Sequence, residues 1–305
     1  MTAYGSANKY APLAQKWTSA ILDYTPTWSA FAAIQAPGNT AGSLQVFHDL
    51  SVGELSAWTD GSAITAGSYG AGPVQTITAT GKGLKVELKR GDVVRDPGLI
   101  DRKAAELVNA AQREIEKAVY TALDTSPSTA YSVGGGLRNY LSGTGDPHPL
   151  EDGVTTQFND IATALSNASL EDARVTMRKW KNFGDGSPIG LGNGPLVLVV
   201  PPDLEGLANR ITGSASFGSE LTALQGEMNP HSQRNYTVVS SPYLTSTVEW
   251  FLIDPAAAPI RVFAPVAPHL AIEEQAGDQL TVLSISMEVT SFIQAPPDGL
   301  VGSSA

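Results

Sequence analysis

Residues 96–127 read DPGLIDRKAAELVNAAQREIEKAVYTALDTSP, which is the clearest structural signal in the chain. The pair Asp96-Pro97 is typical of a helix start, as an N-cap residue followed by proline at the first helical position. No glycine or proline follows Gly98 before Asp124, and Ser126-Pro127 then ends the helix. Apolar side chains recur at steps of three and four and so share one helical face; they are Ile100, Ala104, Leu107, Val108, Ala111, Ile115, Ala118, Val119 and Ala122. At about 1.5 Å per residue, this predicts a rod of roughly 40 Å.

A two-stranded ribbon is predicted before this helix, over residues 41–96. One arm is Leu44–Leu50, and the other runs from Val74 to about Arg95. Within the second arm, the alternation over Leu84–Lys89 places apolar side chains on one face and charged side chains on the other. The tip between the arms is rich in glycine, with Gly61, Gly67, Gly70 and Gly72. Because isolated ribbons are marginal in water, we expect this one to lie on another surface.

The segment before the ribbon, residues 1–40, carries aromatic and apolar side chains without a core of its own. These side chains are Trp17, Ile21, Leu22, Tyr24, Trp28 and Phe31. Pro12, Pro26 and Pro37 limit any helix here to short pieces. We expect the segment to pack on the rest of the fold, or else on a neighbouring subunit.

After the long helix, the pattern is mixed. Two helices are expected over Thr156–Leu165 and Leu170–Lys181, with Ser169 capping the second. A buried strand Leu196–Val200, a helix Asp203–Arg210 and a strand Tyr236–Ser240 follow. The last sixty residues predict the strands Trp250–Ile253, Ile260–Phe263, Leu270–Glu273 and Leu280–Phe292, and then a loose tail after Ala295. The fold class is α+β.

The amino-acid composition restricts the classes of function that the chain can have. Charged residues make up 16% of the chain, which fits a surface covered by neighbouring subunits but equally an ordinary domain with a Ser/Thr-rich exterior. A formal net charge of −11 disfavours a dedicated nucleic-acid binder, although not a protein that encloses DNA. The absence of cysteine excludes disulfides, thiolate nucleophiles and cysteine-ligated zinc. We see no secretion signal and no membrane segment, so we expect a soluble, cytoplasmic protein.

No constellation of residues predicts catalysis. The histidines His48, His148, His231 and His269 are scattered, and we expect all four on the surface or in loops. Gly190–Gly194 is similar to a nucleotide-binding loop but precedes a strand, so we interpret it as a turn. The adjacent carboxylates Glu273-Glu274 and Glu151-Asp152 would point to opposite faces of a strand. The sequence therefore predicts no catalytic, cofactor-binding or metal-binding residue, and no cofactor.

Short blocks in the second half carry a family resemblance. They are Leu198-Val-Val-Pro-Pro-Asp-Leu-Glu-Gly206, Asn229-Pro230, Val238-Val-Ser-Ser-Pro-Tyr-Leu244, Trp250-Phe-Leu-Ile-Asp254 and Pro259-Ile-Arg-Val-Phe263. Together, over about residues 190–265, they resemble the major head subunit of Mu-like phages and related tailed-phage major capsid proteins. Their order and spacing, rather than any one block, make the resemblance specific.

The resemblance implies a Hong Kong 97-type capsid fold. Its parts would be an N-terminal arm (1–40), an extended β-loop or E-loop (41–96), a spine helix of the P domain (97–127), an A domain (128–245), and return strands of the P domain with a C-terminal tail (246–305). Unlike many relatives, the sequence has no long charged helical segment before residue 40, so a separate scaffolding protein or a removed segment is expected.

The implied function is a virion shell assembled in the bacterial cytoplasm from hexamers and pentamers of this chain. The implied partners are portal, scaffolding and decoration proteins, and the enclosed double-stranded DNA is not recognised by sequence. Two alternatives stay open, namely an encapsulin-like nanocompartment shell protein and a soluble carbohydrate-binding or adhesin domain of a phage tail.

Overall fold

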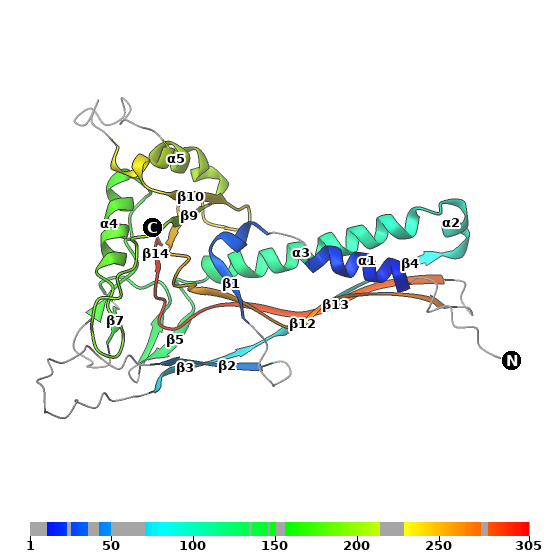
Figure 1. Ribbon diagram of the computed structural model, residues 1–305, viewed down its shortest axis with the longest axis horizontal. Coiled ribbons are helices and arrows are strands. Elements are labelled where there is room, and N and C mark those ends of the chain that lie inside the picture. The colour runs from blue at the N-terminus through cyan, green and yellow to red at the C-terminus, as the bar shows by residue number, and fades with distance from the viewer. Residues whose placement is uncertain are drawn as a thin grey trace, which may run out of the picture.

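The computed structural model describes residues 11–22, 26–35, 43–49, 71–133, 136–145, 147–150, 156–213, 229–275 and 280–304. The described chain forms two four-stranded sheets joined by one long helix (Figure 1). One sheet is long and narrow and extends to one side, whereas the other is short and lies among helices near the C-terminal end (Figure 1).

The predicted long helix is confirmed as α3, Leu99–Asp124, but it begins later than expected. A short helix that was not predicted, α2 (Arg90–Arg95), comes first, and the extended backbone of Asp96 separates the two. Asp96 therefore does not cap α3 directly: its Oδ1 accepts a hydrogen bond from the Gly98 N–H at 3.1 Å, and Gly98 is the N-cap residue. The buried face includes most of the predicted positions, and also Tyr120 and Leu123.

The long sheet has the strand order β1-β12-β13-β4. Its strands are β1 (Ala32–Gln35), β12 (Ile260–Gln275), β13 (Leu280–Ile293) and β4 (Thr80–Lys89). Helices α3 and α1 (Ala11–Leu22) lie along one face of the sheet (Figure 1). The strands predicted separately at 260–263 and 270–273 form the single strand β12, which continues through register shifts between Phe263 and His269.

The predicted ribbon is only partly correct. Strand β2 (Ser43–Asp49) pairs with β3 (Ala71–Thr78), as expected for its two arms. The second arm was expected to continue to Arg95, but from Thr80 onward it leaves the ribbon and pairs with β13. Ile77 of β3 packs against Phe263 and Phe292, so the base of the ribbon is held on its own chain. Of the predicted glycine-rich tip, Gly72 falls within β3, whereas Gly61, Gly67 and Gly70 lie outside the described residues.

The first helical segment packs on the body of the chain. Trp28, in the short 3-10 helix η2 (Thr27–Ala30), and Phe31 are buried in the main core, and Trp17 of α1 packs against that core. The expectation of packing on the chain's own fold is confirmed for Trp17, Trp28 and Phe31, whereas Tyr24 and the side chains of Ile21 and Leu22 lie outside the described residues.

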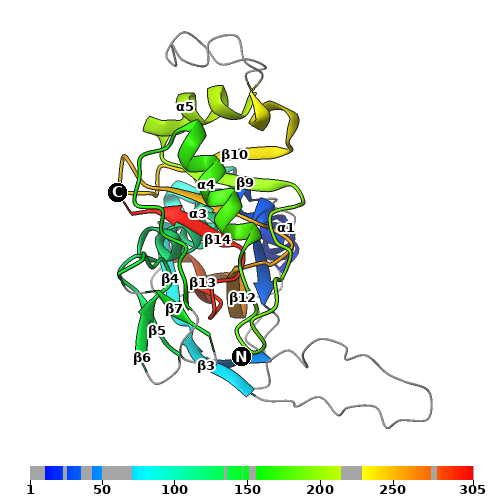
Figure 2. The ribbon, with the colours of Figure 1, turned by 90° about the vertical axis from the view of Figure 1, so that its left-hand side faces the viewer.

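The short sheet has the order β10-β9-β11-β14. Its strands are β10 (Tyr236–Ser240), β9 (Leu196–Val200), β11 (Trp250–Ile253) and β14 (Leu300–Ser303), and the first three match predicted strands. Helices α4 (Asn167–Arg178) and α5 (Pro202–Gly213) cover one face, with α3 behind the other (Figure 2). Alternate residues of β9 belong to the two cores on either side, which is why this strand is apolar throughout.

The tail after Ala295 was expected to be loose, and this prediction is wrong. Residues 300–303 form β14, which pairs with β11 and is buried along its whole length. A Cβ on Gly302 would lie 2.8 Å from Phe251 Cδ1 and 2.8 Å from the Trp250 carbonyl oxygen, so only glycine fits there. A segment of only four residues that includes a glycine has too weak an apolar pattern to predict a strand.

The helix expected over Thr156–Leu165 is also absent from the described residues 156–165. Only β8 (Thr156–Gln157) forms, paired with β7 (His148–Pro149). The backbone beyond it bonds to distant partners: the N–H groups of Asn159 and Asp160 both donate to the Ser142 carbonyl oxygen at 3.0 Å. The next helix, α4, is capped by Ser166 and not by Ser169, which instead completes the capping box.

The remaining elements are small. Strands β5 (Ala130–Val133) and β6 (Gly136–Asn139) form a hairpin beside the C-terminal end of α3. The 3-10 helix η3 (Pro230–Gln233) precedes β10 and contacts α5. None of the helices in the described ranges combines the length and apolarity that a membrane span requires.

Candidate functional site

Two of the four histidines are buried, contrary to the expectation that all lie on the surface or in loops. His148 and His231 are each 1% exposed, whereas His269 is exposed on β12. His48 lies in β2, where its side chain is outside the described residues. Burial is possible because both ring nitrogens of each buried histidine have polar partners.

His148 belongs to a buried hydrogen-bond network centred on Asn159. The Asn159 Oδ1 accepts from the Ser142 N–H and the His148 Nε2–H, both at 2.9 Å. Its Nδ2 donates to the carbonyl oxygens of Tyr140, at 2.8 Å, and Leu300, at 3.0 Å. The network therefore connects β7, the segment after the β5–β6 hairpin, and β14. The oxygen and the nitrogen of the Asn159 amide each make two hydrogen bonds within the protein, which makes this cluster a structural element.

His231 is held between two elements of the short-sheet region. Its Nε2–H donates to the Asn167 carbonyl oxygen at 3.1 Å, and its Nδ1 lies 3.2 Å from the Tyr236 hydroxyl, which donates to it. Burial lowers the pKa of His231, and the charges of Arg234 and Arg174 act in the same direction. The Asn167 carbonyl and Glu171 oppose the shift. We therefore expect the neutral imidazole in the folded protein near neutral pH.

Acid should destabilise the fold through His231. In the folded protein, the pKa of His231 lies below the usual histidine value of about 6.5. As the pH falls through and below that value, the unfolded chain therefore binds more protons than the folded chain. The free energy of unfolding should thus decrease on acidification, by at most about 1.4 kcal/mol per pH unit for this one group. Urea unfolding at pH 7.0 and 5.5 measures this; His231→Gln should flatten the dependence, whereas His269→Gln, on an exposed histidine, should not.

The remaining enzyme-like motifs are a glycine loop and two pairs of adjacent carboxylates. The Gly190–Gly194 loop is a turn leading into β9, as predicted, and the Gly192 N–H donates to Asp254 Oδ2 at 2.8 Å. Glu273 and Glu274 are adjacent on β12 and exposed, while residues 151–155 lie outside the described ranges. Within the ranges that are described, no three His, Asp or Glu side chains are grouped so as to hold a metal ion.

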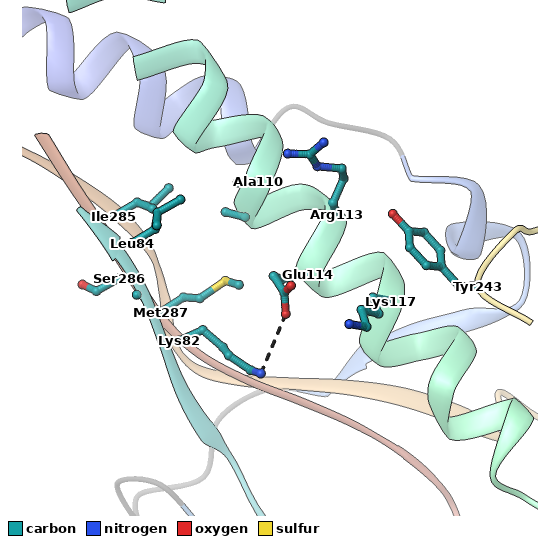
Figure 3. Close-up of a pocket in the computed structure, with 12 residues that line it drawn as sticks. Lys82, Leu84, Ala110, Arg113, Glu114, Lys117, Tyr243, Ile285, Ser286 and Met287 are labelled. Atoms are coloured by element: carbon teal, nitrogen blue, oxygen red, sulfur yellow. Dashed lines mark ion pairs between the residues drawn. The ribbon is translucent and has the colours of Figure 1, made fainter. Parts of the chain in front are cut away.

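A groove of about 470 Å³ lies between α3 and strand β4 (Figure 3). Leu84, Ile285 and Met287 form its apolar floor, and Tyr243 lies at one end (Figure 3). Lys82, Arg113, Glu114 and Lys117 stand around its rim. The Lys82 ammonium is 3.8 Å from the Glu114 carboxylate, an exposed pair that stabilises little.

The groove adjoins an open edge of the long sheet. Strands β1 and β4 are the outermost strands of that sheet among the described residues, and each carries a large exposed apolar side chain. Ile34 on β1 is 74% exposed and Leu84 on β4 is 51% exposed. An open strand edge offers unpaired backbone groups to another chain. This arrangement suits protein–protein contact rather than the chemistry of a small substrate.

Sequence reasoning missed this groove. The apolar face of residues 84–88 was predicted, but it was placed in a free ribbon instead of beside α3. The missing information was the pairing of β4 with β13, which lies about two hundred residues further along the chain. No local pattern reveals a contact over that separation.

Comparison with known proteins gives consistent results. A profile of the family described as "Phage capsid protein" matches residues 70–293. A search of curated proteins finds no match. Among solved structures, the mature capsid of bacteriophage PhiM1 aligns at 11% identity over 92% of this chain and 87% of that one, with a TM-score of 0.56.

Two further structures show the same fold. The capsid of Ralstonia phage GP4 aligns at 13% identity over 88% of this chain and 86% of that one, with a TM-score of 0.55. The virus-like particle from Pyrococcus furiosus aligns at 10% identity over 97% of this chain and 99% of that one, with a TM-score of 0.52. At these identities the similarity concerns the fold.

Proposed function

The chain belongs to the phage capsid protein family, and from that premise we propose that it is the major capsid protein of a tailed phage. The family is one of structural virion proteins and not of enzymes. The α+β fold is that of Hong Kong 97-like capsids. The observation that carries the proposal is the family match over most of the chain, together with the full-length likeness to capsid structures.

In the proposed assembly, copies form hexamers and pentamers that build an icosahedral shell around double-stranded DNA. Residues 128–245 would act as the A domain around the local symmetry axis. The P domain would comprise α3 and the strands after residue 246, and residues 1–40 and 41–96 would act as arm and E-loop. The open edges of β1 and β4 and the groove beside α3 support contacts of this kind.

Further partners follow from the same proposal. A shell of this type requires a portal and a scaffolding function, and decoration proteins are a further proposed partner. The net charge of −11 supports a wall that encloses DNA without binding it by sequence. Membership of the Mu-like subgroup is proposed on the blocks between residues 190 and 265, the first of which spans the end of β9 and the start of α5.

Two alternatives to a phage capsid protein have different degrees of support. The likeness to the virus-like particle favours a nanocompartment shell as the second candidate, since it covers nearly the whole of both chains. A soluble tail or adhesin domain has no comparable support among these matches. The phage family profile, which matches residues 70–293, favours the capsid.

Electron microscopy of the purified, expressed chain tests the proposal. We expect round shells, or hexameric and pentameric capsomers, because the fold leaves open strand edges that a partner copy can cover. A discrete monomer or trimer that binds sugar would contradict it. Shells of a single size that retain a cargo protein in place of DNA would favour the nanocompartment instead.

A further inference from the structure

A pocket of arginine side chains lies where strands β9 and β10 begin. The pocket has a volume of about 430 Å³ and is bounded by α4, the turn before β9 and the segment before β10. Arg174 and Arg178 lie one turn apart on α4, and Arg234 follows η3. Tyr236, Asn235 and Asn193 complete a largely polar wall. The positive charges of this pocket therefore come from three cations, two on α4 and one at the end of η3.

One carboxylate is shared by two of these arginines. Glu171 Oε2 accepts hydrogen bonds from Arg174 Nε and Arg234 Nη1, both at 3.0 Å, and Oε1 accepts from Arg174 Nη2. The hydrogen bond from Arg174 lowers the pKa of Glu171, so the carboxylate remains ionised. Arg178 has no ion pair with any residue in the described ranges. Two positive charges thus remain without a counter-charge.

The turn before β9 fixes the position of Arg178. Gly192 has a φ of +74°, and a Cβ there would lie 3.2 Å from Arg178 Cγ. The turn therefore packs directly on the aliphatic stem of Arg178, and the guanidinium extends from a supported base. Holding a side chain in place lowers the entropy that it loses when it binds an anion.

The opposite end of the same sheet is acidic. Strands β9 and β10 are parallel and β11 is antiparallel to them, so Glu249, just before β11, lies at the end away from the arginine pocket. Asp124 Oδ1 accepts a hydrogen bond from the Thr245 N–H at 2.9 Å, and Asp160 Oδ1 accepts from the N–H of Ser304, next to the Ser303–Trp250 pair, so both carboxylates lie on the Glu249 side of the sheet. Burial raises the pKa of Glu249, and the charges of Asp124 and Asp160 act in the same direction. Throughout the described ranges, no cation forms an ion pair with these three carboxylates.

We infer that the arginine pocket of one copy binds the carboxylate cluster Asp124, Asp160 and Glu249 of a second copy. The inference rests on the proposed function, because an assembly of copies supplies the carboxylates. Surfaces at opposite ends of one sheet meet in a head-to-tail contact, which closes into a ring when the rotation allows it. Such a contact also removes unbalanced charge from both surfaces of a chain whose net charge is −11.

Charge reversal in the full-length chain tests this contact. Arg178→Glu and Glu249→Lys should each slow assembly at least tenfold, as followed by light scattering and sedimentation in buffer of physiological salt. Neither the Arg178 nor the Glu249 side chain makes a hydrogen bond with a described residue, so the melting temperature of each variant should equal that of the wild type. The double variant should regain most of the wild-type rate, because the two charges are exchanged. Lys179→Glu, a neighbouring exposed cation that does not line the pocket, serves as the control.

The outcomes separate the inference from the proposed function. If the wild type forms shells and Arg178→Glu assembles at the wild-type rate, or the double variant is no better than the singles, the contact does not exist. If Arg178→Glu assembles normally but its particles retain less nucleic acid, the pocket binds phosphate and the inference is wrong. A wild type that never assembles would overturn the proposed function itself, and the inference with it.

Discussion

A chain lacking residues 300–305 is expected to lose its cooperative unfolding transition. Leu300 and Val301 are each 1% exposed, and they pack into the cores on opposite faces of the short sheet. Burial of two such side chains contributes roughly 3–6 kcal/mol. The deletion also removes the pairing of β14 with β11 and exposes the buried edge of that strand. The total is comparable to the whole stability of a typical domain, about 5–15 kcal/mol.

Circular dichroism melting and urea unfolding measure this effect. Removal of Ala305 alone is the matched control, because β14 ends at Ser303 and remains intact. A sharp transition in the 300–305 deletion, within a few degrees of the full-length chain, would show that β14 does not stabilise the fold. The same comparison tests Gly302, since Gly302→Val should behave like the deletion through its clash with β11.

Replacing Asn159 by alanine is expected to cost at least about 3 kcal/mol in the free energy of unfolding. The side chain is fully buried and bonds to four groups, namely the Ser142 N–H, the His148 ring and the carbonyl oxygens of Tyr140 and Leu300. Alanine would leave these groups buried without partners, each at a cost of roughly 1–3 kcal/mol.

Two further variants sharpen the result. Asn159→Asp keeps both acceptor contacts but loses the two donated hydrogen bonds, so it should also destabilise the chain. Asn109→Ala, at an exposed position of α3, should change stability by less than about 0.5 kcal/mol. Equal stabilities of Asn159→Ala and Asn109→Ala in urea unfolding would disprove the role of the network.

The sequence predicted those parts of the fold that have a strong local pattern. Helix α3 and strands β9, β10, β11 and β13 follow from the spacing of their apolar residues, and β9 stands out because both of its faces are buried. The family resemblance supplied the arrangement of these elements. The absence of a predicted catalytic constellation rested on the residues alone and remains a prediction.

The sequence could not predict pairings between distant segments. Strand β4 looked like part of a ribbon arm because its alternation is the same whether it pairs with the first arm, β2, or with β13. Residues 156–165 looked helical because the side-chain pattern does not show that Ser142 and Gly302 bind their backbone. The arginine pocket was missed for the same reason, since Arg178 and Arg234 are brought together only by the packing of α4 against the short sheet.

The pairing of the long sheet also determines when this chain can fold during its synthesis. Strand β1 pairs Ala32 with Ile260, and β4 pairs Thr80 with Val289. The first third of the protein therefore leaves the ribosome long before its partner strands exist, with its apolar faces uncovered. Contacts over such separations form slowly. Nascent copies on one messenger RNA cannot complete the long sheet, and the folding chaperones of the cell have a long interval in which to bind them.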